Sequence, residues 1–166
     1  GAHFDMKDYH VYSMEDPNGE VVDHGVALDI KDVPWAKRQM WSNDVACKDG
    51  KYYMYFPAKD KDDIFRIGVA VSDKPEGPFK PLPEPMKGGF SIDQSVFVDD
   101  DGTQYLYWGG IWGGQLQRYK TGKYENNDDL RQPDEPALCA KVAKLADSMT
   151  EFGEEPHDVV ILDAYG

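Results

Sequence analysis

The feature that most constrains this chain is a block of sequence that occurs twice, 52 positions apart. Residues 45–56 read VACKDGKYYMYF, and residues 97–108 read FVDDDGTQYLYW. Each copy is a short apolar strand, a turn ending in Asp-Gly and an alternating strand rich in aromatics, which is typical of a β-hairpin. Two such units predict an all-β fold assembled from repeated sheets.

The period of the repeat favours a β-propeller. A unit near fifty residues made of several short strands is typical of a propeller blade, whereas solenoid units are usually shorter or helical. Residues 66–80 follow the first hairpin with a strand, a Pro/Gly turn and another short strand, and residues 10–23 have the same layout. A weaker version covers residues 142–160. The count is roughly two and a half blades, whereas closed propellers have about four to eight.

We therefore expect residues 1–166 to form one partial propeller domain. The expected units are the end of one blade (1–28), a second blade (29–88) and a third blade (89–166) with a loop inserted near 120–138, where the sequence is polar. Because the blades are too few and the first residues contain no initiator Met, we expect the rest of the propeller to lie outside this chain. The alternative is a small, complete β-domain, which the length alone permits.

Composition excludes several classes of function. The net charge of -13 and the pI near 4.6 argue against nucleic-acid binding, which needs a basic face, but allow a neutral, polyhydroxylated ligand. No stretch approaches the roughly 20 apolar residues of a membrane helix, so we expect a soluble protein without a membrane partner. Cys47 and Cys139 are too few for a disulfide framework or a metal cluster. The compartment, cytoplasmic or secreted/periplasmic, stays open.

Polar residues just ahead of the repeated hairpins are the candidates for chemistry. In a propeller the innermost strand opens each blade and its end lines the central funnel, so residues 39–45 and 89–96 are placed to meet a ligand. Asp93 is the strongest candidate, because it lies between Ile92 and an apolar strand where a carboxylate is not needed for solubility. The alternative is a turn or capping Asp that accepts hydrogen bonds from nearby backbone N–H groups.

These motifs, in this order, resemble glycoside hydrolase family 43. The resemblance rests on IDQSVFVDDDGTQYLYWGGIWGG at residues 92–114, on Trp-x-x-Asp-Val at residues 41–45 and on DGKYYMYF at residues 49–56. It covers about residues 5–119 and is strongest to the β-xylosidase and α-L-arabinofuranosidase branch, with FDMKDY at residues 4–9 and DIKDVPW at residues 29–35 in support. The resemblance implies a five-bladed β-propeller.

The resemblance also implies an inverting glycosidase with three carboxylates. Asp93 matches the Asp of the family's Ile-Asp-Pro-Ser motif, which raises the pKa of the general acid and orients it; this sequence departs from the motif at Gln94. The general-base Asp and the general-acid Glu are expected to fall before Gly1 and after Gly166, so this chain alone is expected to be inactive. Glu76 is an alternative for the acid, because its Glu-Gly-Pro context resembles the surroundings of the acid in some family members. Its place in the repeat argues otherwise, since residues 75–78 are expected to connect the outer strands of a blade, far from the funnel.

Four further residues are predicted to contact substrate. Sugar rings stack on flat apolar surfaces, with polar groups to bind their hydroxyls. Trp41 and Asp44 stand at the family's Trp-Ala-Pro-Asp motif, where Ser-Asn replaces Ala-Pro. Trp112 belongs to the glycine-rich run GGIWGG at residues 109–114, and Gln115 follows that run. The alternative for the tryptophans is packing within or between blades, which is the better expectation for Trp108.

The expected ligands are oligosaccharides or plant cell-wall polysaccharide fragments, and the other expected partner is the remaining blades. No cofactor is expected to be required, although the resemblance allows a calcium ion in a complete propeller; the Asp99–Gly102 run lacks the ligand pattern of an EF-hand and is expected to be a solvated turn. Two other functions stay open: a noncatalytic carbohydrate-binding propeller, and a propeller scaffold for protein partners. Neither would turn over a glycoside.

Overall fold

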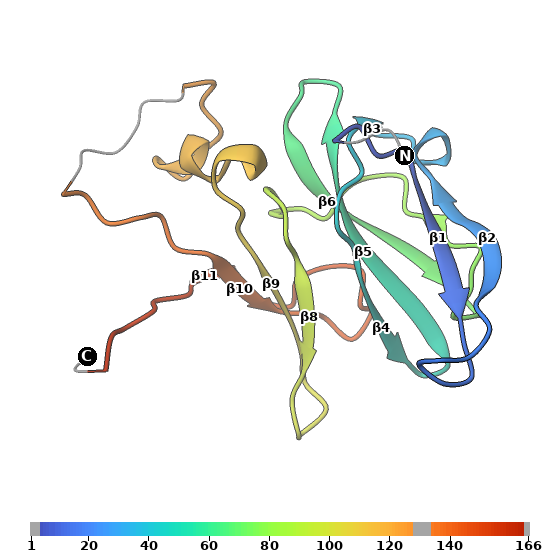
Figure 1. Ribbon diagram of the computed structural model, residues 1–166. Helices are drawn as coiled ribbons and strands as arrows, with labels where there is room; N and C mark the ends of the chain where they lie inside the picture. The colour runs from blue at the N-terminus through green and yellow to red at the C-terminus, as the bar shows by residue number, and fades with distance from the viewer. Residues whose placement is uncertain (1–3, 128–133, 165–166) are drawn as a thin grey trace.

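The computed structural model describes residues 4–127 and 134–164. In this part of the chain the regular structure consists of antiparallel strands and short 3-10 turns, arranged as three sheets side by side (Figure 1). The all-β prediction is therefore confirmed. The elements are β1 (Asp8–Ser13) and β2 (Val22–Asp29) in the first sheet; β3 (Ala36–Arg38), β4 (Asp44–Lys48), β5 (Lys51–Asp60), β6 (Phe65–Ser72) and β7 (Lys80–Pro81) in the second; β8 (Ser95–Val98), β9 (Gln104–Trp108), β10 (Lys141–Lys144) and β11 (His157–Asp158) in the third; and the 3-10 turns η1 (Ile30–Asp32), η2 (Trp112–Gly114) and η3 (Leu116–Tyr119).

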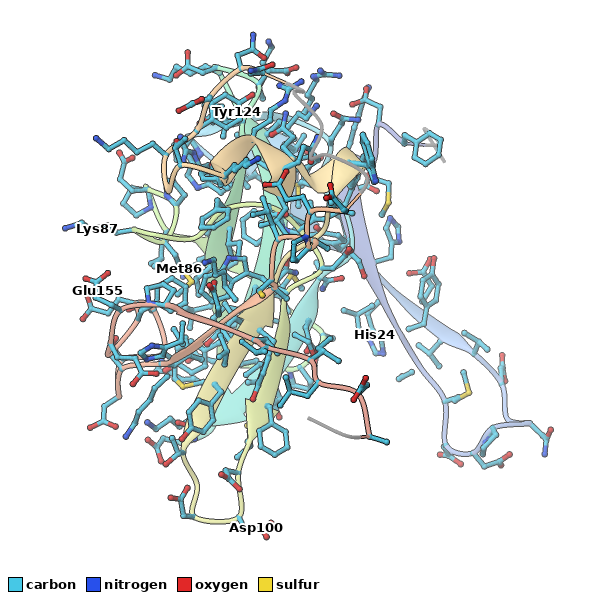
Figure 2. The ribbon with its side chains drawn as sticks, turned by 90° about the vertical axis from the view of Figure 1, so that its left-hand side faces the viewer. His24, Met86, Lys87, Asp100, Tyr124 and Glu155 are labelled. Carbon is cyan, nitrogen blue, oxygen red and sulfur yellow. The ribbon has the colours of Figure 1, made fainter. Side chains whose placement is uncertain are left out.

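Both predicted hairpins form. β4 and β5 are joined by Asp49 (φ 51°) and Gly50 (φ 75°), two left-handed residues whose twist suits a two-residue hairpin turn. The second turn is longer, because the last pair of that hairpin is Val98 with Gln104. Asp100 lies exposed at its tip (Figure 2). The longer turn shifts the register of β8 by one residue relative to β4.

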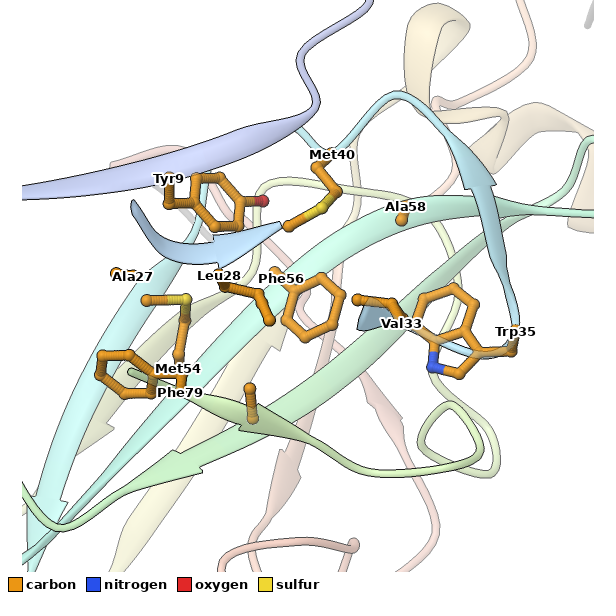
Figure 3. Close-up of a cluster of buried hydrophobic side chains, with 11 residues drawn as sticks. Tyr9, Ala27, Leu28, Val33, Trp35, Met40, Met54, Phe56, Ala58 and Phe79 are labelled. Atoms are coloured by element: carbon orange, nitrogen blue, oxygen red, sulfur yellow. The ribbon is translucent and has the colours of Figure 1, made fainter. Parts of the chain in front are cut away.

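The second sheet lies between the other two and is covered on both faces. Alternate side chains of β5 point to opposite sides, as the pleat of a strand requires. Met54 and Phe56 enter a cluster with the first sheet, in which Trp35 stacks on Phe56 with ring centroids 5.9 Å apart (Figure 3). Tyr55 enters the cluster against the third sheet, together with Leu106. The two clusters hold the first and third sheets against opposite faces of the second sheet.

The three sheets span residues 8–29, 36–81 and 95–158. Their assignment to propeller blades stays a prediction. Of the loop expected near 120–138, residues 128–133 lie outside the described residues. Within the described ranges, no helix has the length and apolarity needed to cross a membrane.

Candidate functional site

Asp93 lies in an irregular segment just before β8, and the backbone of this segment turns its carboxylate outward. Ser91 (φ 66°) and Asp93 (φ 59°) are both left-handed, a conformation that costs of order 1 kcal/mol for a non-glycine residue. Ser91 and Ile92 on one side and Gln94 on the other are buried, whereas Asp93 is exposed. Among the described residues no group donates a hydrogen bond to its carboxylate, unlike a capping Asp.

The glycine-rich run packs against the backbone that carries Asp93. The Gly109 and Gly110 N–H groups donate to Ile92 O at 3.0 and 3.3 Å, and Ser91 Oγ donates to Gly110 O at 2.7 Å. A Cβ atom on Gly110 would lie 2.2 Å from Ile92 Cγ1 and 2.9 Å from Asp93 Oδ2. Glycine is therefore required at position 110 for the backbone to approach this closely.

Gln94, which sequence reasoning treated only as a departure from the family motif, ties the Asp93 segment to the second sheet. Its buried Nε2 group donates to Ser42 O at 2.8 Å and to Tyr55 O at 3.0 Å. The Gln94 amide thus connects the Asp93 segment to the segment that carries Trp41. The only sequence signal was an amide at a position where the family usually has proline, which has no polar side chain.

Asp44 links the two hairpins. Its Oδ2 accepts hydrogen bonds from Val96 N at 2.8 Å and Ser95 Oγ at 3.0 Å, and its Oδ1 accepts one from Val45 N at 2.8 Å. Because of the register shift in β8, Asp44 opposite Tyr55 corresponds to Ser95 opposite Tyr107. Its carboxylate is engaged in joining the second and third sheets, and a contact with substrate stays a prediction.

Trp41, Trp112 and Gln115 come together at one pocket of about 490 Å³ between the second and third sheets. The Gln115 amide is engaged by the second sheet, because Oε1 accepts from Phe65 N and Nε2 donates to Asp63 O, each at 3.0 Å. Its role in binding substrate stays a prediction. The residues that line this pocket, called the indole pocket below, are Trp41, Lys59, Trp112, Gly113, Gln115, Gln117 and Arg118.

The two indole rings differ in how firmly they are held. Trp41 Nε1 donates to Phe4 O at 2.6 Å, and its ring packs 4.7 Å from the ring of Phe65. Trp112 is 60% exposed and left-handed (φ 58°), so its indole faces solvent. Trp108, by contrast, is 1% exposed and stacks on Phe152, as expected for a packing residue.

Asp93 and the indole pocket lie at the same end of the third sheet, where β8 begins and β9 ends. Gly110 contacts the Asp93 segment, and the same run continues into Trp112 and Gly113 at the pocket. Tyr124, which accepts a hydrogen bond from Arg118 of the pocket, lies at the opposite end of the molecule from Asp100 (Figure 2).

Glu76 is remote from Asp93. It follows the end of β6, and that end pairs with the beginning of β5, next to the turn at Asp49 and Gly50.

The described residues contain no group of three or more His, Cys, Asp or Glu side chains that could hold a metal ion. The Asp99–Gly102 run forms an exposed turn closed by its own backbone, with Gly102 N donating to Asp99 O. A calcium ion in a complete propeller stays a prediction.

An exposed carboxylate near two indole rings is suited to a sugar ligand, because sugar rings stack on flat apolar surfaces and polar groups bind their hydroxyls. The sequence matches Glycosyl hydrolases family 43 over residues 20–160. The chain belongs to this family. It is 61% identical to a xylosidase/arabinosidase from Bacteroides ovatus and 57% identical to xylosidase/arabinosidase 43A from Humicola insolens, covering 100% and 98% of this chain and 51% and 52% of those proteins.

Solved structures agree. RS223-β-xylosidase superposes with a TM-score of 0.93 at 59% identity, over 100% of this chain and 52% of that one. The GH43_1 enzyme from Xanthomonas citri, complexed with xylotriose, gives a TM-score of 0.93 at 52% identity, over 99% and 50%. The chain spans about half the length of the relatives it matches.

Proposed function

We propose that the protein containing this chain is an inverting glycosidase that hydrolyses xylose- or arabinose-containing saccharides, with Asp93 as the carboxylate that supports the general acid. The observation that carries the proposal is the conformation of Asp93. A left-handed residue between buried neighbours holds an exposed carboxylate, without a hydrogen-bond donor among the described residues, beside a pocket with two indole rings. Strain of this kind is often retained at functional sites.

The chemistry follows from the charge of Asp93. A carboxylate near the general acid disfavours ionisation of that acid by like-charge repulsion, which keeps it protonated near neutral pH. Inversion further requires that acid and base stand about 6.5–9.5 Å apart, so that a water fits between base and sugar. The indoles of Trp41 and Trp112 would stack on the sugar rings.

We infer that the general acid and general base are supplied from outside residues 1–166, so that this stretch alone does not hydrolyse a glycoside. The remote position of Glu76 supports this inference, because it removes the Glu that the sequence offered as a substitute acid. A calcium ion in the complete propeller remains compatible with the proposal and is given no role in it.

The test measures hydrolysis of aryl β-D-xyloside and aryl α-L-arabinofuranoside by the full natural protein. NMR identifies which anomer of the sugar is released first. We expect turnover of at least one substrate with inverted configuration. The alternative, a noncatalytic carbohydrate-binding propeller, predicts that xylotriose raises Tm without any turnover. A scaffold for protein partners predicts neither effect, and retention of configuration would contradict the inverting mechanism.

A further inference from the structure

Trp112 presents its indole to solvent with little support from neighbouring side chains. The residue is 60% exposed, and no aromatic ring among the described residues packs against it, whereas the Trp41 ring lies 4.7 Å from that of Phe65. The backbone of Trp112 is left-handed (φ 58°). Because so little packs around the ring, its direction follows from the backbone that carries it.

The loop that carries Trp112, residues 110–116, is closed by its own hydrogen bonds. Gln115 N donates to Trp112 O at 3.0 Å, and Leu116 N donates to Gly110 O at 3.2 Å. The first residue of the loop, Gly110, contacts the Asp93 segment. These bonds set the shape of the loop, but its other end needs a separate attachment to hold the indole at the pocket.

Gln115 supplies that attachment. The residue is left-handed (φ 69°) and 7% exposed, and its amide lies against the turn between β5 and β6. Its Oε1 accepts a hydrogen bond from Phe65 N and its Nε2 donates one to Asp63 O, each at 3.0 Å. An amide that bonds one donor and one acceptor of the same turn fits in one orientation, so it fixes the direction of the loop as well as its position.

The turn that receives this amide is itself closed by hydrogen bonds. Asp60 Oδ1 accepts from Ile64 N, and Asp60 N donates to Ile64 O, each at 3.0 Å. Arg38, on β3, donates two hydrogen bonds to the Asp63 carboxylate. The second sheet therefore offers Gln115 a fixed anchor for a loop that belongs to the third sheet.

The competing explanation is a direct contact between Gln115 and a sugar, because the residue lines the indole pocket. The bonds of its amide argue against this, since the turn engages both ends of the amide. The Phe65 N–H that it satisfies is buried, and a buried donor without a partner is unfavourable. The amide is thus held by the turn and is not free to rotate toward a ligand.

We propose that Gln115 is a positioning residue for the indole of Trp112. It fixes the loop that presents the ring to a saccharide, in place of the direct contact expected from the sequence. This inference rests on the proposed function, because it concerns the pocket to which that function assigns the saccharide.

The test is a double-mutant cycle on the affinity for xylotriose, measured by calorimetry. All proteins are the full natural protein carrying Asp93→Asn, so that bound saccharide is not consumed. We expect Trp112→Ala to weaken binding about tenfold, the worth of one aromatic stacking contact, and Gln115→Met to weaken it about fivefold. The double variant should lie within about twofold of Trp112→Ala alone, because Gln115 has no ring left to position. Independent contacts would instead multiply to about fiftyfold.

Two further variants control for effects on folding. Gln115→Gly removes the amide but suits the left-handed backbone, so it should show the same loss of affinity as Gln115→Met in a stable protein. Gln104→Met is the same substitution at a residue whose side chain has no hydrogen bond among the described residues, and it should leave the affinity unchanged. Melting temperatures show which variants are folded.

A fiftyfold loss in the double variant would overturn the inference, because it would mean that Gln115 binds the saccharide by itself. Unchanged affinity in folded Gln115→Met and Gln115→Gly would overturn it as well, since Gln115 would then serve stability alone. So would unchanged affinity in Trp112→Ala, or no binding of xylotriose. An absence of turnover in the protein with Asp93 intact would contradict the proposed function and leave the cycle readable.

Discussion

At the scale of single residues, the candidate site depends mainly on hydrogen bonds between side chains and the backbone. Gln94 is the clearest case, because its amide donates to two carbonyls of the second sheet, at Ser42 and Tyr55. Two carbonyls can be satisfied only by the NH₂ end of the amide, which fixes its orientation. Gln94 thereby sets the position of the backbone that carries Asp93.

Substitutions at Gln94 test this role. Gln94→Met leaves buried carbonyls without their donor and should cost about 1–3 kcal/mol of unfolding free energy. Gln94→Glu should cost more, since a carboxylate would face two carbonyl oxygens. Urea unfolding measures both, with Gln104→Met, whose side chain has no hydrogen bond among the described residues, as a control expected within about 0.5 kcal/mol of the parent. A Glu variant as stable as the parent would refute the assignment.

At the scale of elements, the glycine-rich run is the support on which the Asp93 segment rests. Gly110 is in contact with Ile92 and Asp93, and any Cβ there overlaps both. We expect Gly110→Ala to cost about 1–3 kcal/mol, because the segments must separate. It should also reduce kcat in the full natural protein, because Asp93 would move.

The control for this substitution is Gly102→Ala. Position 102 has open space around a Cβ but a φ of +83°, so alanine there should cost only about 1 kcal/mol through backbone strain and leave kcat unchanged. Equal effects of the two substitutions on kcat would mean that close approach at Gly110 does not position Asp93. Thermal unfolding and initial rates supply the two readouts.

At the scale of the whole molecule, the free energy of unfolding should fall at acid pH because Asp63 becomes protonated. Hydrogen bonds from Arg38 are the main cause that lowers the pKa of Asp63 to about 2 in the folded chain, against an ordinary value of 3.8. A depressed folded pKa stabilises the protein above the unfolded value, and this stabilisation is lost as the pH falls from about 4 to about 2.

Comparison with Asp63→Asn isolates that contribution. Because the Asp63 side chain is 42% exposed, solvent screening limits the effect to about 1 kcal/mol. The difference in unfolding free energy between parent and variant should therefore be largest at neutral pH and shrink between about pH 4 and pH 2. A difference that stays constant through this range would show that the ion pairs of Asp63 do not stabilise the fold.

Sequence predicted the elements better than their connections. The Asp-Gly turns and alternating aromatics predicted both hairpins, because these signals are local. The one-residue shift of β8 escaped prediction, since it depends on a turn longer than the two-residue turn of the first hairpin. The hydrogen bonds of the Gln94 amide and of Asp44 Oδ2 join residues 39 to 52 positions apart in sequence, and only the packing of two sheets brings such residues together.

The proposed glycosidase site depends above all on Asp93. Its most direct test is kcat of the full natural protein and its Asp93→Asn variant on aryl β-D-xyloside and aryl α-L-arabinofuranoside, with Tm measured on the same samples. We predict that kcat falls about 10²-fold or more, because the general acid loses the charge that keeps it protonated, while Tm is retained. An unchanged kcat in a folded Asp93→Asn protein would contradict the account.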